Sequence, residues 1–422
     1  MRVAHIMRKY QPAEWGGTET ALQRLTEGLG RHGVESVVFC PADGPGGATD
    51  ARDPLAAAGC TVKRFRACVP VWGLRAAARR QMLAVGGNLL SFELPRLLAR
   101  EPSLDIVHTH TLGRLGGIAL AAARRRRVPG VVTIHGGVLD LPPKVRQELS
   151  APVRGGLEWG RLFGWWWRAR HVLADADAIL TCNPREAELM SQQHPDKRII
   201  VHPHGVHLAH HRTDHRAAAL AAFPAIAGRK VLLCVGRIDA VKNQFWLVER
   251  APQIFQRHPD ALLVFAGACT DPVYGATLKR EVATLGLAPR VLFTGGLPPG
   301  DPRLIGLMQT ARVVLLPSLS ETFGLVLLEA WAAGTPVIAS RTSGASALID
   351  HGENGWLFKL GDALSFHTAL NRVLLEPELA ARQAAAGARL VEREYDTTVL
   401  AGRMQALYYD LIEKKNALHH PA

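Results

Sequence analysis

At 422 residues, the chain is long enough for two domains of ordinary size, each with its own core, and this length disfavours a single domain. No apolar run approaches the roughly 20 residues of a spanning helix, and Met1–His5 leads straight into a strand instead of a signal peptide, so we expect a cytoplasmic protein. Six scattered cysteines without a Cys-x-x-Cys pair argue against a disulfide framework.

The net charge of +13 is unevenly distributed. Residues 1–205 carry 28 Lys and Arg against 18 Asp and Glu, net +10, whereas the remainder carries 22 against 19, net +3. The first half therefore favours an anionic partner: a phosphate-bearing acceptor, an anionic membrane surface or nucleic acid.

Strands and helices alternate from the start of the chain. Val3–Met7 is typical of a short buried strand, and Thr18–Arg31 of a helix with Thr18 as its cap. Between them, Gly16 and Gly17 lack a Cβ, which lets a ligand approach backbone N–H groups at the start of the helix. A lone Gly-Gly is more often an ordinary turn, so this pair needs support from elsewhere.

Further strands are expected at Val34–Phe39 and Thr61–Phe65, with a long or broken helical stretch over Leu74–Arg100. The next strand leads into His108 and His110, which face one side because they lie two residues apart. They could share a metal ion, but the sequence offers no third ligand nearby, and we expect no metal there.

His135 follows the apolar run Val131–Ile134. A histidine at the carboxyl end of a parallel strand projects into the crevice where such sheets bind ligands, although a structural role is equally compatible with the pattern. Asp175 and Asp177 form an Asp-x-Asp triplet that could hold a divalent metal, but Asp177 leads directly into a strand, which argues against that role. The six histidines from His202 to His215 are spaced irregularly among Pro and Gly, which is typical of a polar linker.

A second series begins with the apolar strand Lys230–Val235, followed by Arg237 and Lys242. Arg237 offers a planar fork of donors and Lys242 a compact charge, and together they can bind a diphosphate without a metal. Either residue alone would be interpreted as a surface cation. Gly295, with Gly296, follows a later strand of the same series.

The stretch Ser318–Pro336 combines a loop and a helix after a buried strand at Arg312–Pro317. Ser320 or Thr322 can cap the helix, whose positive end then points to the carboxyl edge of the sheet, where an anion is stabilised. Glu321 precedes the helix and Glu329 lies about two turns into it. Ionised carboxylates accept hydrogen bonds from the hydroxyls of a ribose or hexose, although each Glu alone would suit a solvated helix.

These motifs together resemble the retaining glycosyltransferases of family four, which have the GT-B fold. The resemblance rests on the following groups: Glu321-x-Phe323-Gly324 with Glu329, Gly236-Arg237-Ile238 with Lys242-Asn243, Val132–Gly136 around His135, Gly16-Gly17, and the linker His202–Val206. The linker departs from the family in having His204 where Asn is usual. The resemblance covers nearly the whole chain and is weakest over residues 42–100.

The resemblance implies an α/β architecture of two Rossmann-like domains facing across a cleft, with a C-terminal helix that crosses back. It places an acceptor-binding domain at 1–205, a donor-binding domain at 206–395 and the returning helix at 396–422. The implied catalytic residues are His135, Glu321, Arg237 and Lys242. The implied donor-binding residues are Gly16, Gly17, Arg237, Lys242, Gly295, Glu321, Phe323, Gly324, Leu325 and Glu329.

The implied activity is the transfer of a hexose-type sugar from a UDP- or GDP-sugar to an acceptor hydroxyl, without metal or other cofactor, in cell-surface glycan or glycolipid synthesis. The alternatives are a soluble small-molecule acceptor or, less favoured, a nucleotide-sugar 2-epimerase of the same fold. A sugar-binding protein without catalysis would lack one of the key residues, all of which are present. A nucleic-acid partner is indicated by charge alone, and we expect none.

Residues 157–170 combine tryptophans with Arg161, Arg168 and Arg170, a composition that suits the water-lipid boundary. A buried helix could look the same, because Trp165, Trp166 and Trp167 would spread round roughly 200 degrees of a helix and at least one would face the core. Peripheral contact with an anionic membrane is therefore an open expectation.

Overall fold

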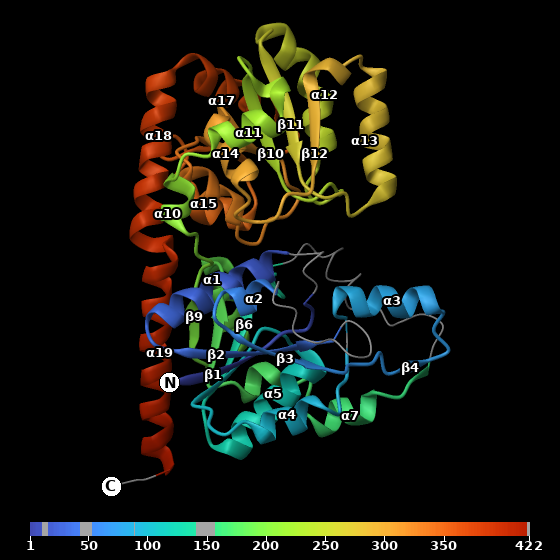
Figure 1. Ribbon diagram of the computed structural model, residues 1–422, viewed down its shortest axis with the longest axis vertical. Coiled ribbons are helices and arrows are strands. Elements are labelled where there is room, and N and C mark those ends of the chain that lie inside the picture. Colours follow the sequence, from blue (N-terminus) through green and yellow to red (C-terminus); the bar gives the residue numbers. More distant parts are fainter. Residues whose placement is uncertain (11–15, 43–52, 88, 141–156, 420–422) are drawn as a thin grey trace. The chain divides into compact units, whose positions relative to one another are not determined.

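The computed structural model describes the chain except for residues 11–15, 43–52, 88, 141–156 and 420–422 (Figure 1). The chain divides into two compact units, Met1–His204 with Thr397–Ala422, and Gly205–Asp396. The C-terminal helix therefore belongs to the first unit, as the fold class implied.

A seven-stranded parallel sheet forms the middle of the first unit, in the order β3-β2-β1-β5-β6-β8-β9. Its strands are β1 (Arg2–Ile6), β2 (Glu35–Pro41), β3 (Thr61–Phe65), β5 (Ile106–Thr109), β6 (Gly130–Ile134), β8 (Ala178–Thr181) and β9 (Ile199–Val201). The strand order reverses between β1 and β5, which makes their carboxyl ends a topological switch point, the place where open α/β sheets bind ligands. The pairing of these strands sets His5 opposite His108.

Helices cover both faces of this sheet. They are α1 (Gly17–Arg31), α2 (Pro54–Ala57), α3 (Ala76–Val85), α4 (Leu94–Arg100), α5 (Gly113–Arg126), α7 (Arg161–Trp166), α8 (Val172–Asp175), α9 (Pro184–Gln193) and α19 (Thr397–His419). One apolar cluster joins α4 and α5 to the sheet, and another joins α1 and α19 to the opposite face (Figure 1). The helices α1 and α19 pack closely at Gly28, where a Cβ would lie 2.6 Å from the Cβ of Ala401.

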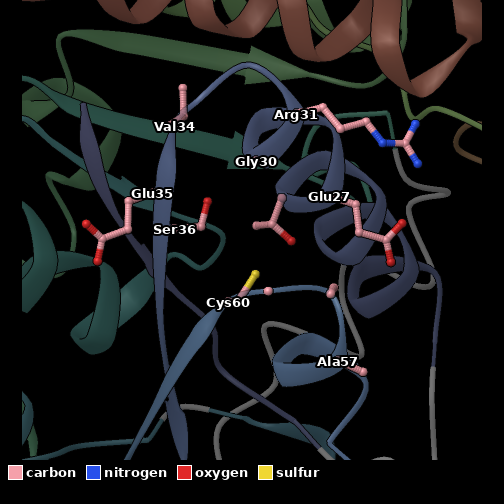
Figure 2. A pocket seen from close by; sticks show the side chains of 11 residues that line it. Glu27, Gly30, Arg31, Val34, Glu35, Ser36, Ala57 and Cys60 are labelled. Carbon is pink, nitrogen blue, oxygen red and sulfur yellow. The ribbon is translucent and has the colours of Figure 1, made fainter.

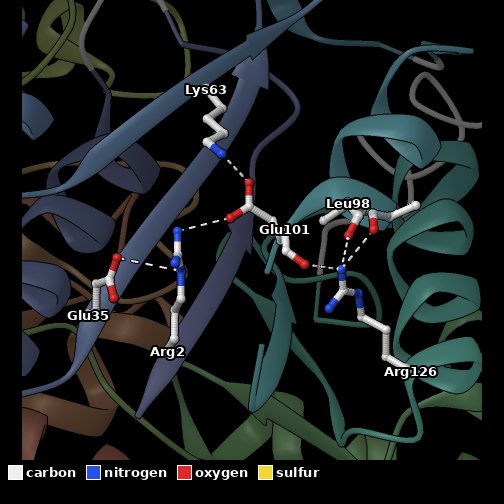
Figure 3. A network of polar contacts seen from close by, with 7 residues as sticks. Arg2, Glu35, Lys63, Leu98, Glu101 and Arg126 are labelled. Carbon is white, nitrogen blue, oxygen red and sulfur yellow. Dashed lines mark hydrogen bonds and ion pairs between the residues drawn. The ribbon is translucent and has the colours of Figure 1, made fainter. Parts of the chain in front are cut away.

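A polar network holds the amino ends of the first strands (Figure 3). The side chain of Glu101 is 1% exposed and pairs with Arg2 at 3.0 Å and with Lys63. Arg126 donates to the carbonyl of Leu98 at 2.8 Å, and Arg2 lies 3.5 Å from Glu35. The buried carboxylate of Glu101 therefore has two cationic partners, as a buried charge requires.

The second unit contains a six-stranded parallel sheet in the order β12-β11-β10-β13-β14-β15. Its strands are β10 (Lys230–Val235), β11 (Ala261–Ala266), β12 (Val291–Gly295), β13 (Val313–Leu316), β14 (Val337–Ser340) and β15 (Trp356–Phe358). Here the order reverses between β10 and β13, so the loops that follow these two strands are neighbours at the second switch point. The amide of Leu319 donates to the carbonyl of Val241 at 2.8 Å and joins the two loops.

The helices of the second unit are α10 (Leu208–Arg212), α11 (Arg216–Ala222), α12 (Gln244–Arg257), α13 (Pro272–Thr284), α14 (Pro302–Thr310), α15 (Leu325–Ala332), α16 (Ser343–Leu348), α17 (Ala363–Leu375) and α18 (Pro377–Leu390), with a π-helical turn at Val391–Tyr395. Trp246 of α12 stacks on Phe358 at 4.8 Å between ring centroids and meets Phe366 edge-on. These aromatic contacts fix α12, and with it the loop that carries Arg237 and Lys242, against the sheet.

Both predicted helix caps are wrong. Gly16, and not Thr18, caps α1, and the carboxylate of Glu19 accepts its N–H at 3.1 Å. Gly324 is the N-cap residue of α15, a position that was predicted for Ser320 or Thr322. The backbone of Gly324 lies in the left-handed region at φ 92°, which favours glycine over Ser or Thr.

The prediction of a long or broken helical stretch over 74–100, interrupted at Gly86, is confirmed: Gly86 adopts φ 67° and ends α3, and α4 begins at Leu94. Residues 157–170 form a two-residue strand, β7 (Leu157–Glu158), paired with β4 (Val71–Trp72), and then the short helix α7. Trp165 and Trp166 are 77% and 65% exposed, whereas Trp167 packs against the core.

Candidate active site

Closely packed backbone forms the floor of the candidate site in the second unit. Gly236 follows β10 with φ 150°, and a Cβ at Gly267 would lie only 1.9 Å from the carbonyl oxygen of Gly236. The amide of Gly267 donates to the carbonyl of Gly295, which ends β12, at 2.9 Å. The carboxyl ends of β10, β11 and β12 therefore approach one another without intervening side chains.

Arg237 lies on this floor with its side chain 61% exposed. Its guanidinium pairs with the carboxylate of Asp239 at 3.2 Å, and its carbonyl accepts a hydrogen bond from the side chain of Gln244 at 2.7 Å. Asp239 also accepts the backbone N–H of Lys242 at 3.0 Å. Asp239 thus links the two cations and leaves the guanidinium open to solvent.

Lys242 and Glu321 form an ion pair, with Nζ 2.5 Å from the carboxylate. Their side chains are 21% and 17% exposed. The sequence reading assigned these residues to different parts of a donor, and the structure places them in direct contact. In this ion pair, the ammonium group of Lys242 and the carboxylate of Glu321 neutralise each other.

The loop that carries Glu321 is anchored by α16. The amide of Gly344 donates to the carbonyl of Glu321 at 2.8 Å, and a Cβ at Gly344 would lie 2.5 Å from the amide nitrogen of Phe323. Only glycine fits this position without displacing the loop. Sequence reasoning missed Gly344, and the only available signal was a glycine in the first turn of a short helix.

The predicted donor residues Phe323, Leu325 and Glu329 lie along the same loop and helix. Phe323 is 4% exposed, and Leu325 is the first residue of α15, whose N-cap is Gly324. Glu329 is 7% exposed, which excludes the alternative of a solvated helix residue. The start of a helix is suited to hold phosphate oxygens, because its first N–H groups have no partner within the helix.

Gly16 and Gly17, by contrast, belong to the first unit. The carboxylate of Glu19, which is 6% exposed, occupies the hydrogen-bonding position at the start of α1.

His135 lies at the carboxyl end of β6. Its Nε2 is 2.8 Å from Nδ1 of His110, and its ring stacks on His204 at 5.1 Å between centroids. Burial, followed by His204 and Arg8, lowers the pKa of His135 well below its ordinary value, so the ring is neutral at pH 7. His204, the departure from the family linker, is therefore buried against a candidate catalytic residue.

The expectation that His108 and His110 lack a third nearby ligand is wrong, because β1 brings His5 beside them. Ligand atoms of the three rings lie within 4.8 Å of one another, and all three side chains are buried. However, both nitrogens of His108 have partners, with Nδ1 2.6 Å from the hydroxyl of Tyr408 and Nε2 2.6 Å from that of Thr133. The residues therefore fit a hydrogen-bonded cluster at least as well as a metal site.

Asp175 and Asp177 bond to cations and backbone. Asp175 pairs with Arg124 and Arg168, both at 2.8 Å. Asp177 accepts the amide of Gly130 at 2.8 Å and pairs with Lys415 of α19. These contacts give both carboxylates structural partners.

A pocket of about 550 Å³ lies between α1 and β2 (Figure 2). Its lining includes Glu27 and Arg31 of α1, Glu35 and Ser36 at the start of β2, and Cys60 before β3. It therefore opens at the amino ends of β2 and β3, away from the carboxyl edge that holds ligands in such sheets.

Two family models match the chain. The model described as Glycosyl transferase 4-like domain matches residues 16–205, and the model described as Glycosyl transferases group 1 matches residues 218–390. Together they cover both units apart from the linker, the first residues and the C-terminal part.

Among curated relatives, D-inositol 3-phosphate glycosyltransferase of Mycolicibacterium paratuberculosis is 31% identical over 91% of this chain and 84% of that one. The enzyme of the same name from Arthrobacter sp. is 30% identical over 84% and 82%. The counterpart from Nocardia farcinica is 32% identical, but its match spans 64% of this chain and only 58% of the relative's length.

Solved structures show the same fold. HepE from Anabaena, solved in complex with UDP and in complex with UDP-glucose, superposes with a TM-score of 0.72 at 17% and 18% identity, over 97% of this chain and 100% of that one. Sucrose-phosphate synthase from Thermosynechococcus elongatus also has a TM-score of 0.72, at 23% identity over 98% and 99%. These likenesses establish the GT-B architecture.

Proposed function

The chain belongs to the family four glycosyltransferases, and on that premise we propose that it transfers a hexose-type sugar from a UDP- or GDP-sugar to an acceptor hydroxyl with retention of configuration. One observation carries the proposal. The loops after β10 and β13 bring Arg237, Lys242 and Glu321 together at a switch point, beside the start of α15, whose N-cap is Gly324.

In this proposal, the two cations stabilise the negative charge that develops on the leaving diphosphate, so no metal ion is required. The acceptor hydroxyl attacks the anomeric carbon on the face that the diphosphate leaves, and the protein supplies no nucleophile. Glu321 exchanges its pairing with Lys242 for hydroxyls of the sugar, because the diphosphate attracts the ammonium group.

The other residues hold the donor and acceptor. The N–H groups of Phe323–Leu325 bind the sugar and the diphosphate, Glu329 binds the ribose, and Gly295 borders the base. In the same proposal, Gly16 and Gly17 of the first unit also bind the diphosphate, and His135 acts on the sugar or the acceptor.

The acceptor that we propose is a small, soluble, phosphorylated polyol, and the reaction takes place in the cytoplasm. The relatives that match most of this chain are named for D-inositol 3-phosphate, and the first 205 residues carry the positive charge that a phosphate would favour. This acceptor replaces the cell-surface glycan as the favoured one.

A donor-acceptor matrix tests the proposal. Purified protein is incubated with UDP- and GDP-sugars, with and without inositol phosphates, in buffer containing EDTA, and products are identified by mass spectrometry and by the anomeric coupling in NMR spectra. We expect a glycosylated phosphopolyol with the donor's configuration. An inverted product, loss of activity in EDTA, or free sugar isomers of the kind that a 2-epimerase releases would contradict it.

A lipid-linked acceptor at an anionic membrane is the second candidate, and the surface of α7 favours it. Trp165, Trp166 and Leu162 are 77%, 65% and 65% exposed, and the side chain of neighbouring Arg161 is 76% exposed. Exposed aromatic groups beside a cation suit a lipid surface. No helix in the described parts of the chain is long and apolar enough to cross a membrane.

Sedimentation with liposomes separates the two acceptors. If the second candidate holds, the protein binds vesicles that contain anionic lipid at low salt, and a Trp165→Ala/Trp166→Ala variant stays in the supernatant. If wild-type protein stays in the supernatant with and without donor, the lipid-linked acceptor is contradicted and the soluble acceptor is supported.

A further inference from the structure

Three imidazoles form an unbroken row from the interior of the first unit to the candidate catalytic histidine. Nδ1 of His5 lies 3.0 Å from Nε2 of His110, and Nδ1 of His110 lies 2.8 Å from Nε2 of His135. At the inner end, Nε2 of His5 is 3.5 Å from the hydroxyl of Ser36. We call Ser36, His5, His110 and His135 the histidine row.

The two ends of the row differ. Ser36 lines the pocket between β2 and α1, which opens at the amino edge of the sheet (Figure 2). At the other end, Nδ1 of His135 is buried and has no hydrogen-bond partner among the residues that the structure describes. A buried, unpaired ring nitrogen at the carboxyl edge of the sheet, where such sheets bind ligands, is available for a hydrogen bond with a substrate hydroxyl.

All three rings are neutral at pH 7. Burial lowers the pKa of His5 to about 3, and burial together with neighbouring imidazoles lowers that of His110 well below its ordinary value. The groups that face the row are His108, His202, His204 and Arg8, and each of them opposes a positive charge on it. A neutral imidazole has one donor nitrogen and one acceptor nitrogen.

Because each neutral ring carries a single proton on one of its two nitrogens, the fully hydrogen-bonded row has two states. Each link joins Nδ1 of one ring to Nε2 of the next, so a hydrogen bond forms only where one of the two carries the proton. In the first state every ring is protonated on Nδ1, and His135 presents a donor. In the second state every ring is protonated on Nε2, and His135 presents an acceptor. A mixed set leaves one link with two lone pairs or two protons facing each other.

We propose that His110 and His5 are positioning residues for His135, because the histidine row makes its tautomer depend on theirs and so decides whether Nδ1 of His135 donates to or accepts from the substrate. The proposal rests on the assignment of His135 to the reaction. A change of state moves one proton along each link. A proton that arrives at Nδ1 of His135 displaces those on Nε2 of His135, His110 and His5 in turn, and the hydroxyl proton of Ser36 leaves to water in the pocket.

Nitrogen NMR of histidine tests the row directly, without requiring activity. Protein labelled with ¹⁵N-histidine is studied at pH 7.5, and the resonances are assigned by single His→Gln variants. We expect His5, His110 and His135 to be neutral and to share one tautomer. A charged ring, or one ring in the opposite tautomer, would overturn the proposal, as would stoichiometric zinc that EDTA removes with a shift of the His5, His108 and His110 resonances.

Variants give the second readout. His110→Phe keeps an aromatic ring at this position but removes both nitrogens, so His135 should populate both tautomers. We expect kcat to fall by up to about 100-fold, while the affinity for free nucleotide is retained. His108→Phe is the matched control, since this equally buried ring bonds to Tyr408 and Thr133 and should leave the tautomer of His135 unchanged. An unchanged tautomer in His110→Phe would refute the coupling.

The two readouts separate the proposals. If the protein transfers no sugar but the three histidines share one tautomer, the proposed function is contradicted and the coupling of the histidine row is supported. If the protein transfers sugar but the tautomers are mixed, only the coupling is contradicted.

Discussion

The pairing of Lys242 with Glu321 determines how the two cations of the candidate site should differ. Arg237 is exposed and has Asp239 as its partner, so its loss removes one contact to the diphosphate. Loss of Lys242 also leaves Glu321 without a counter-charge beside that diphosphate. The two substitutions are therefore not equivalent, although both remove one positive charge.

We expect Lys242→Ala to weaken binding of free UDP or GDP more than Arg237→Ala, with each loss about 1.5–3 kcal/mol, the range for hydrogen bonds to charged groups. Isothermal titration calorimetry measures the affinity of each variant for the free nucleotide. Arg372→Ala is the control, because Arg372 forms an exposed pair with Glu376 on α17. Wild-type affinity in both Lys242→Ala and Arg237→Ala would remove the diphosphate assignment.

Glu321→Gln should act in the opposite direction on nucleotide binding. The amide no longer neutralises Lys242, so affinity for free nucleotide should stay equal or rise, whereas turnover should fall because the carboxylate no longer accepts the hydroxyls of the sugar. Calorimetry and initial rates on the same preparation separate the two effects. A parallel loss of nucleotide affinity and rate would indicate that Glu321 supports the loop and does not bind sugar.

At the scale of single residues, the sequence was sufficient to predict that Arg237, Lys242 and Glu321 lie on loops that follow parallel strands. It could not place Lys242 against Glu321, because side-chain pairing depends on the adjacency of β10 and β13. The histidine row was missed for the same reason: His5 and His110 are about a hundred residues apart and meet through the register of β1 and β5. Both strands are buried along almost their whole length, so their apolar runs lack the alternation that could specify this register.

At the scale of elements, apolar runs were sufficient to predict most strands, because strands covered on both faces carry few polar residues. The caps were mispredicted for the opposite reason. Ser and Thr are good caps in isolation, but glycine caps both α1 and α15. A Cβ at Gly16 would lie 2.9 Å from the carboxylate of Glu19, and Gly324 has a φ of 92°, which disfavours Ser or Thr. Propensity rules do not include these tertiary and backbone constraints.

The contact of α1 with α19 depends on one glycine. Gly28→Ala places a Cβ 2.6 Å from that of Ala401 and 2.9 Å from the carbonyl of Thr397, so we expect the first unit to lose about 1–3 kcal/mol of unfolding free energy. Gly30→Ala is the control on the same helix, since its Cβ would meet nothing within 4 Å. It should gain up to about 1 kcal/mol from helix propensity.

Urea unfolding, with limited proteolysis of α19 as a second measure, compares the two variants. Equal stabilities for Gly28→Ala and Gly30→Ala would mean that α19 does not depend on this close approach.

At the scale of the whole molecule, the length of the chain predicted two domains, and the structure has two compact units. Buried histidines give the first unit a further property that charge counting misses. Burial lowers the pKa of His5 and His204 to about 3 and that of His202 to about 4, and it lowers those of His108, His110 and His135 as well. All six belong to the first unit.

We therefore expect the first unit to lose stability on mild acidification. Unfolding returns each buried histidine to a pKa near 6.5, so below that pH the unfolded state binds protons that the folded state refuses, and the unfolding free energy falls as pH falls. The loss begins near pH 6.5 and continues to about pH 3–4, at about 1.4 kcal/mol per pH unit for each histidine. Ionised carboxylates with lowered pKa values, such as Asp410, lose their contribution only at lower pH, so histidines dominate between pH 6.5 and 5.

Urea unfolding at pH 7.5, 6.5, 5.5 and 5.0, resolved by hydrogen exchange of β1, β5 and β6, measures this slope. His5→Gln should reduce it by about one proton, because a glutamine takes up none on unfolding. His171→Gln replaces an exposed histidine and serves as the matched control. A first unit whose stability is level between pH 7.5 and 5 would show that the buried rings take up protons as readily in the folded state as in the unfolded state, and would contradict the lowered pKa values.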